Sequence, residues 1–241
     1  MFEFNKEAIK TAFVDEFGDR ITHLAAAGSI VNGRSNHSSD LDLLLIIKNR
    51  DKDDLVKCRT VVQGLTPYKI DLSLKYLEEL PKNAADYQDG PRTSLCLAYI
   101  SSALFIIGEN HFTEVLKTLP IYEFRKSIIH AVGEYLMRME SLFFTSDKDD
   151  QAEVQKQSYK YLTRIIIDVQ LFFKPSDMGP YKLLTRDEML GLGKQDNRIS
   201  QYLASITEQS AAEDIIAAMA QLHKYLVDNN TNDQTTPSYV S

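Results

Sequence analysis

The stretch that decides the fold is Leu24-Ala-Ala-Ala-Gly-Ser-Ile-Val-Asn-Gly-Arg-Ser-Asn-His-Ser-Ser-Asp-Leu-Asp-Leu-Leu-Leu-Ile-Ile47. Its two ends are runs of small and aliphatic residues, which are typical of buried strands. Residues 28–39 between them are rich in Gly, Ser and Asn, a composition that favours a turn followed by a loop. The sequence therefore predicts a strand over 21–27 and a second strand over 40–47.

Helical patterns surround these two strands. Residues 5–19 carry apolar side chains at helical spacing, and Gly18 marks an expected stop. A charged run over 48–54 opens a further predicted helix that reaches about residue 63, and a third strand is expected over 68–74. Alternating helices and strands predict an α/β or α+β arrangement for this part of the chain.

The second half of the chain is predicted to be helical. Residues 93–107 carry almost no charge, so we expect a buried helix there. Two long amphipathic helices are predicted over 121–144 and 151–173, followed by two short helices and one over 210–227. No strand is expected after residue 75. The predicted fold is α+β: a small mixed sheet with flanking helices, followed by an all-α helical bundle.

Composition excludes several classes of function. The 241 residues are 44% hydrophobic and carry a formal net charge of −7, so a broad basic surface for nucleic acid is not expected. Two cysteines are too few for a disulfide framework, and their spacing suggests no zinc site. No apolar run approaches the ~20 residues that span a bilayer. We therefore expect a cytoplasmic protein that binds neither membrane nor nucleic acid.

Three acidic residues stand inside predicted strands among aliphatic neighbours. Asp40 and Asp42 are two apart, so their side chains point to the same face of a strand. Two carboxylates on one face repel each other and resist burial, unless a divalent cation lies between them. Carboxylate oxygens suit Mg²⁺ or Mn²⁺. Asp71 lies in the next predicted strand, and three carboxylates converge if that strand pairs beside the one carrying Asp40.

A phosphate-binding turn is predicted beside these acids. Gly28 and Ser29 follow directly after the first strand, where backbone N–H groups and a hydroxyl can meet phosphate oxygens. Three acidic residues and a phosphate-binding turn are the groups that two-metal phosphoryl or nucleotidyl transfer requires. In that reaction the ions activate a hydroxyl and offset charge on the α-phosphate. Asp71 would serve either as a metal ligand or as a general base.

The same motifs resemble the DNA polymerase β nucleotidyltransferase superfamily. The resemblance rests on Gly28-Ser29, on Gly33, on Ser39-Asp40-Leu41-Asp42 and on the triplet Ile70-Asp71-Leu72, and it covers roughly residues 20–75. It implies a nucleotidyltransferase head that uses ATP or another nucleoside triphosphate with Mg²⁺, and that moves a nucleoside monophosphate to an acceptor. Ser39 and Arg34 of the loop are included among the expected nucleotide contacts.

The helical half is similar, more weakly, to the aminoglycoside adenylyltransferases of the streptomycin/spectinomycin type. The similar features are Arg164 in the middle of a helix and Tyr181-Lys182 after a Gly-Pro loop. In that group an arginine of the bundle and a lysine after the loop meet the triphosphate, which implies these roles for Arg164 and Lys182. Lys160 lies four residues before Arg164, so the two share a helix face and could form a basic surface toward the triphosphate.

These observations give one leading hypothesis and several alternatives. The leading one is a Mg²⁺-dependent enzyme that transfers AMP from ATP to a hydroxyl, with a small molecule such as an aminoglycoside-type antibiotic as acceptor. Its expected parts are a nucleotidyltransferase domain over 1–110, a helical bundle over 120–228 and a disordered tail over 229–241. The alternatives are an enzyme that AMPylates a partner protein, and a non-catalytic module that binds nucleotide. Growth of an RNA tail is disfavoured by the negative charge.

One further pattern lies in the predicted helix over 121–144. Arg125 and His130 have the Arg-x4-His spacing that resembles nucleases of the HEPN type. In such an enzyme the histidine would act as general base and the arginine would bind phosphate. An ordinary amphipathic helix gives the same spacing, and it is the favoured interpretation here.

Overall fold

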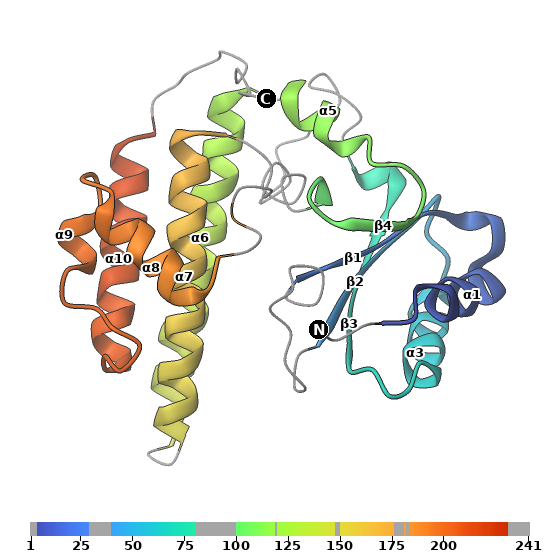
Figure 1. Cartoon of the computed structure of the whole chain (residues 1–241), viewed down its shortest axis with the longest axis horizontal. Helices are drawn as coiled ribbons and strands as arrows, with labels where there is room; N and C mark the ends of the chain where they lie inside the picture. The colour runs from blue at the N-terminus through green and yellow to red at the C-terminus, as the bar shows by residue number, and fades with distance from the viewer. Residues whose placement is uncertain are drawn as a thin grey trace. The chain divides into compact units, whose positions relative to one another are not determined.

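A computed structural model describes residues 4–28, 40–80, 100–118, 120–147, 150–175, 181 and 184–230 (Figure 1). These residues fall into two compact units. The first holds the described residues as far as Leu116, together with Tyr181, and the second holds the remainder.

A four-stranded mixed sheet forms the centre of the first unit. Its strands are β1 (Ile21–Ala27), β2 (Leu41–Ile47), β3 (Ile70–Tyr76) and β4 (Leu104–Ile107), in the order β3-β2-β1-β4. β1 is antiparallel to β2 and to β4, while β2 and β3 run parallel. This small mixed sheet with flanking helices, ahead of a helical region, confirms the predicted fold class.

One face of the sheet is covered by α1 (Lys6–Phe17) and α3 (Asp54–Gly64). Asn5 caps α1 by accepting a 3.1 Å hydrogen bond from the backbone of Ala8, and Gly18 ends the helix at a positive φ of 55°. Alternate residues of β2 face these helices, and they supply much of the hydrophobic core. The main members of that core are Ile9, Phe13, Phe17, Leu41, Leu43, Leu45, Ile47, Cys58 and Val61.

The predicted helix over 93–107 is wrong for its last four residues, which form a strand. The expectation of no strand after residue 75 is therefore wrong as well. Residues 93–99 lie outside the described residues, but Leu104–Ile107 form β4 and pair with β1. A short apolar run gives no periodicity that separates a buried strand from a buried helix. The sequence Leu-Phe-Ile-Ile followed by Gly108, which takes a φ of 80°, is the signal that identifies the strand.

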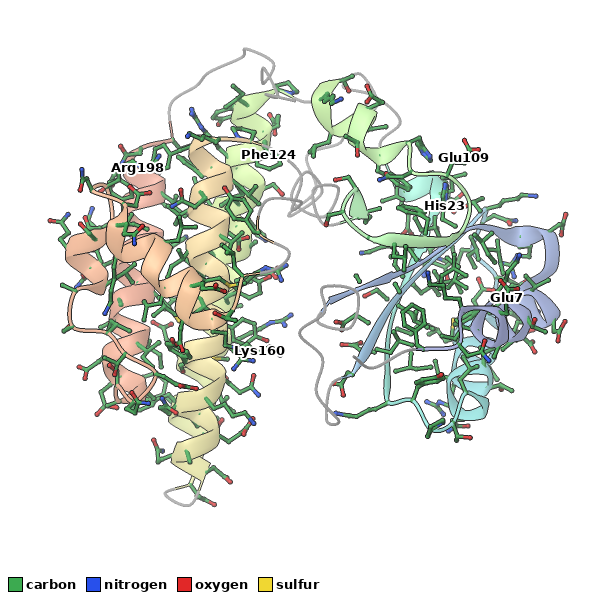
Figure 2. All side chains as sticks on the ribbon, viewed as in Figure 1. Glu7, His23, Glu109, Phe124, Lys160 and Arg198 are labelled. Carbon is green, nitrogen blue, oxygen red and sulfur yellow. The ribbon has the colours of Figure 1, made fainter. Side chains whose placement is uncertain are left out.

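On the other face of the sheet, His23 of β1 is buried in a cluster of rings (Figure 2). Its ring centroid lies 5.9 Å from that of Phe105, 5.1 Å from that of Phe112 and 5.0 Å from that of His111. Burial, reinforced by the neighbouring His111, lowers the pKa of His23 below its ordinary value of 6.5. His23 is therefore neutral in the folded protein at neutral pH.

We expect this buried histidine to make stability depend on pH. When the folded-state pKa is the lower one, the unfolded chain binds protons first, so the free energy of unfolding falls as the pH drops below about 6.5. Urea denaturation followed between pH 7.5 and pH 5 measures this loss. The His23→Gln variant should show a weaker pH dependence than wild type. Equal slopes for the two proteins would contradict the assignment.

The second unit is helical. α6 (Ile121–Thr145), α7 (Gln151–Phe173) and α10 (Ala212–Asp228) pack together, and α8 (Arg186–Gln195) and α9 (Ser200–Leu203) complete it. α7 is the most deeply buried of the long helices, with apolar residues on most of its sides. These bounds agree closely with the predicted helices. Residues 231–241 of the predicted tail lie outside the described residues.

The helices of the described part of the chain carry mixed surfaces. Figure 2 shows charged side chains along them, among them Lys160 of α7. None of these helices is long and apolar enough to cross a membrane.

Candidate active site

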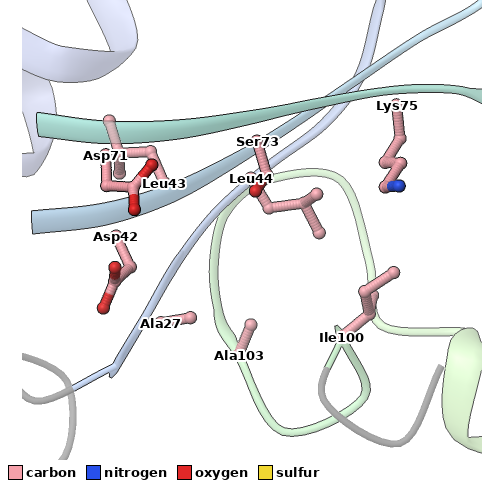
Figure 3. A pocket seen from close by; sticks show the side chains of 9 residues that line it. All are labelled: Ala27, Asp42, Leu43, Leu44, Asp71, Ser73, Lys75, Ile100 and Ala103. Atoms are coloured by element: carbon pink, nitrogen blue, oxygen red, sulfur yellow. The ribbon is translucent and has the colours of Figure 1, made fainter. Parts of the chain in front are cut away.

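The register of β2 and β3 brings two of the predicted acids together. Asp42 stands directly opposite Asp71 across this parallel pair, and it also faces Ala27 of β1. Leu41 and Leu43, one residue to either side of Asp42, face the core beneath α1 and α3, so Asp42 points to the opposite face. Figure 3 shows both carboxylates extending from their strands on this open side of the sheet.

A pocket of about 180 Å³ lies over this face, within the first unit. Its polar lining consists of Asp42, Asp71, Ser73 and Lys75, and its remaining walls are aliphatic (Figure 3). The aliphatic residues are Ala27, Leu43, Leu44, Ile100 and Ala103. Two carboxylates at one end of a pocket with mostly apolar walls form a concave site with a few polar groups, which is the usual form of a ligand site.

Gly28 lies against the Asp42 carboxylate. Its φ is 74°, which residues with side chains rarely adopt, and a Cβ at this position would overlap the Oδ2 of Asp42. Glycine is therefore required here both by the backbone conformation and by the space. The backbone that enters the predicted phosphate-binding turn therefore runs beside this carboxylate.

Asp40, the third predicted acid, has a cation beside it. It lies just before β2, and its Oδ1 is 2.8 Å from the Nζ of Lys69, which lies just before β3. The backbone N–H of Leu41 donates to the carbonyl of Lys69 at 2.8 Å and fixes this end of the strand pair. Because Asp40 and Asp42 share a face, Lys69 adds one positive charge to a row of three carboxylates.

The carboxylate oxygens of the three aspartates are the type of ligand that a hard divalent cation prefers. Asp42 and Asp71 present carboxylate oxygens from adjacent strands. The Asp40 carboxylate binds the ammonium group of Lys69, a position that a metal cation could also occupy. Among the described residues, no three Asp, Glu, His or Cys side chains gather closely enough to be grouped as one metal site. Asp42 and Asp71 are the pair that the fold brings together, with Asp40 at their edge.

The structure does not test the other predicted nucleotide contacts. Ser29, Arg34, Ser39 and Lys182 lie outside the described residues. Lys160 and Arg164 lie one turn apart on α7, in the second unit. The Nε of Arg164 is 3.9 Å from the carboxylate of Asp168, which is fully buried in that unit.

The Arg-x4-His pattern on α6 follows the ordinary interpretation. The Nε of Arg125 donates to the backbone carbonyl of Phe172 at 3.0 Å, and its guanidinium lies 5.1 Å from the centre of the Phe172 ring. Arg125 thus ties α6 to the end of α7. His130 lies 3.5 Å from Glu134 of its own helix. The Arg125 contacts stabilise the packing of α6 against α7, while the His130 contact lies within α6.

Three polar residues of this region were not singled out from the sequence: Lys69, Ser73 and Lys75. The parity of a strand would have found the last two, since side chains at 71, 73 and 75 share one face. Lys69 is also at even spacing from Asp71. This even spacing becomes informative only when one face of β3 is known to be open.

The comparisons with known proteins agree with this geometry. Residues 6–90 match the family model of the nucleotidyltransferase domain. The solved structure of spectinomycin adenyltransferase AAD(9) from Enterococcus faecialis, with ATP and spectinomycin, has the same fold, with a TM-score of 0.53 and 14% sequence identity. The match covers 92% of this chain and 97% of that one. No curated protein sequence matches the chain at a significant level. The chain therefore carries a nucleotidyltransferase domain at residues 6–90, which supports nucleotidyl transfer as its activity.

Proposed function

We propose that this nucleotidyltransferase is an Mg²⁺-dependent adenylyltransferase that moves AMP from ATP to a hydroxyl group of a small molecule. The observation that carries the proposal is the register of Asp42 with Asp71, which puts two carboxylates at one end of a pocket. Two like charges opposite each other weaken a strand pair. The arrangement is explained if a cation offsets that repulsion in the working enzyme.

The acidic residues and the turn after Gly28 have different roles in the proposed reaction. Asp42 and Asp40 would hold Mg²⁺, and Asp71 would either share in holding it or accept the proton of the attacking hydroxyl. The backbone at Gly28 approaches the same carboxylates, so the turn that follows it can receive the β- and γ-phosphates. When bound, the ion would lower the pKa of the hydroxyl and offset charge at the α-phosphate. The aliphatic walls would exclude water from the acceptor.

The first acceptors to test are aminoglycoside-type antibiotics. The similar solved structure holds ATP and spectinomycin, and it matches nearly the full length of both chains. In this proposal Lys160 and Arg164 of the helical unit, together with Lys182, contact the triphosphate. An acidic chain also suits a cationic acceptor in the first encounter.

A calorimetric titration with a non-hydrolysable ATP analogue tests the nucleotide site before any acceptor is known. We expect wild type to bind the analogue in the presence of Mg²⁺ and at least about tenfold more weakly when EDTA is added, because the ion screens the phosphates from the carboxylates. The Asp42→Ala variant should lose the Mg²⁺-dependent part of the binding. Tight binding that ignores both EDTA and the substitution would refute the proposed site.

A further inference from the structure

Lys75 puts a positive charge at the end of the pocket opposite the two acids. It lies four residues after Asp71 on β3, so the two side chains share a face, and their Cα atoms are roughly 13 Å apart. Figure 3 shows Asp42 and Asp71 at one end and Lys75 at the other, with Ser73 between them. The pocket is therefore negative at one end and positive at the other.

The side chain of Lys75 lies beside aliphatic residues of the pocket. The residue is half-buried, and Ile100, Ala103 and Leu44 line the pocket with it. Within the described ranges, no carboxylate forms an ion pair with Lys75. An ammonium group partly removed from water, beside aliphatic walls, gains most from an anion that enters the pocket. This position differs from Lys69, which already has Asp40 as its partner.

The direction of the reaction separates Lys75 from the nucleotide phosphates. Gly28 follows Ala27 at the acidic end of the pocket. In the proposed reaction the β- and γ-phosphates lie at the turn after Gly28, and therefore away from Lys75. Attacking and leaving oxygens stand roughly in line in phosphoryl transfer. The acceptor must therefore approach the α-phosphorus from the side opposite the leaving pyrophosphate. On β3 this side leads past Ser73 to Lys75.

We propose that Lys75 forms an anion-binding subsite for the acceptor, which carries a carboxylate or phosphate group some distance from its reacting hydroxyl. The inference rests on the proposed nucleotidyl transfer and differs from it in the acceptor, which is an anionic small molecule in place of an aminoglycoside-type one. A hydroxyl placed at Asp71 leaves the anionic group roughly 7–12 Å away, given the reach of a lysine side chain along the strand. A polycationic acceptor would instead bring ammonium groups against Lys75.

The first experiment measures the exposure of Lys75 itself. Wild-type protein loaded with the ATP analogue and Mg²⁺ is treated with an amine-acylating reagent, and modification of each lysine is read by peptide mass spectrometry. Matched probes are added: glycerol against glycerol 3-phosphate, and glucose against gluconate and glucose 6-phosphate. At least one anionic probe should slow the acylation of Lys75 by about twofold or more, as expected at half occupancy, while the neutral probes do not. Lys48, an exposed lysine just after β2, is the internal control.

Two outcomes of this experiment would overturn the proposal. Equal acylation with every probe would mean that Lys75 receives no anion from an acceptor. Protection by the ATP analogue alone would place Lys75 in the nucleotide site. Neither outcome would count against nucleotidyl transfer, because binding of the analogue is measured separately.

The second experiment compares variants in the transfer reaction. Release of pyrophosphate from ATP is measured for wild type, Lys75→Met and Lys48→Met, with the anionic probes and with aminoglycosides as acceptors. For an anionic acceptor we expect Lys75→Met to raise KM about tenfold and to leave kcat and the KM for ATP nearly unchanged, since a uniform binding contact is lost. Transfer to aminoglycosides alone, with no effect of Lys75→Met, would support the proposed function and refute the subsite.

Discussion

Asp42→Asn and Asp71→Asn should each lower the rate of nucleotidyl transfer by about a thousandfold or more, while the protein stays folded. Each substitution replaces a charged oxygen by an amide at the same position, so it removes a metal ligand or a proton acceptor without changing the shape of the sheet. Pyrophosphate release at saturating ATP and Mg²⁺ measures the loss. The expected pattern is a fall in kcat, because these charges act on the reacting centre rather than on distant parts of the substrate.

Thermal unfolding of the same variants tests whether a lost activity reflects a lost fold. Asp42 and Asp71 face each other across two strands, so removing one charge relieves repulsion, and thermal unfolding should shift little or slightly upward. Asp15→Asn changes an exposed acid of α1 and should leave both rate and stability unchanged. Activity within tenfold of wild type in the Asp42→Asn/Asp71→Asn double variant would rule out the proposed chemistry.

The acidic centre could be predicted from sequence because its signal is local. Two aspartates at strand spacing among leucines, and a third between aliphatic residues, determine both the face and the chemistry. The pairing of β2 with β3 adds the register that sets Asp42 opposite Asp71. No spacing within a single strand contains that information, since register depends on which strands become neighbours.

The rest of the site depends on long-range contacts. Lys75 carries no motif, and it becomes a candidate only when Ile100 and Ala103, which are distant in sequence, close the pocket around it. β4 was mistaken for a helix because its pairing partner, β1, lies about eighty residues earlier in the chain. Arg164 was predicted as a triphosphate contact by resemblance, and Lys160 by its position four residues earlier on the same helix. Both stay predictions.

A buried ion pair near the start of α3 is expected to dominate the stability of the first unit. The Asp54 carboxylate is fully buried, and it accepts hydrogen bonds of 2.7 and 3.0 Å from the two terminal nitrogens of Arg20. It also accepts one of 2.7 Å from the backbone of Asp51, and Arg20 donates another to the carbonyl of Asn49. Burial alone would raise the pKa of Asp54, but these hydrogen bonds outweigh it and keep the pKa below its ordinary value of 3.8.

Asp54→Ala should therefore lower the free energy of unfolding by about 3–5 kcal/mol, because it leaves the Arg20 charge and the Asp51 N–H without their partner. Urea denaturation at pH 7 measures the loss. Glu79→Ala breaks an arginine–carboxylate contact of similar length, 2.6 Å to Arg50, but between exposed side chains, so its effect should be much smaller. Since the folded-state pKa of Asp54 is the lower one, the wild-type advantage over Asp54→Ala should persist above about pH 4 and shrink in stronger acid. Equal losses in the two variants would mean that burial adds nothing to this pair.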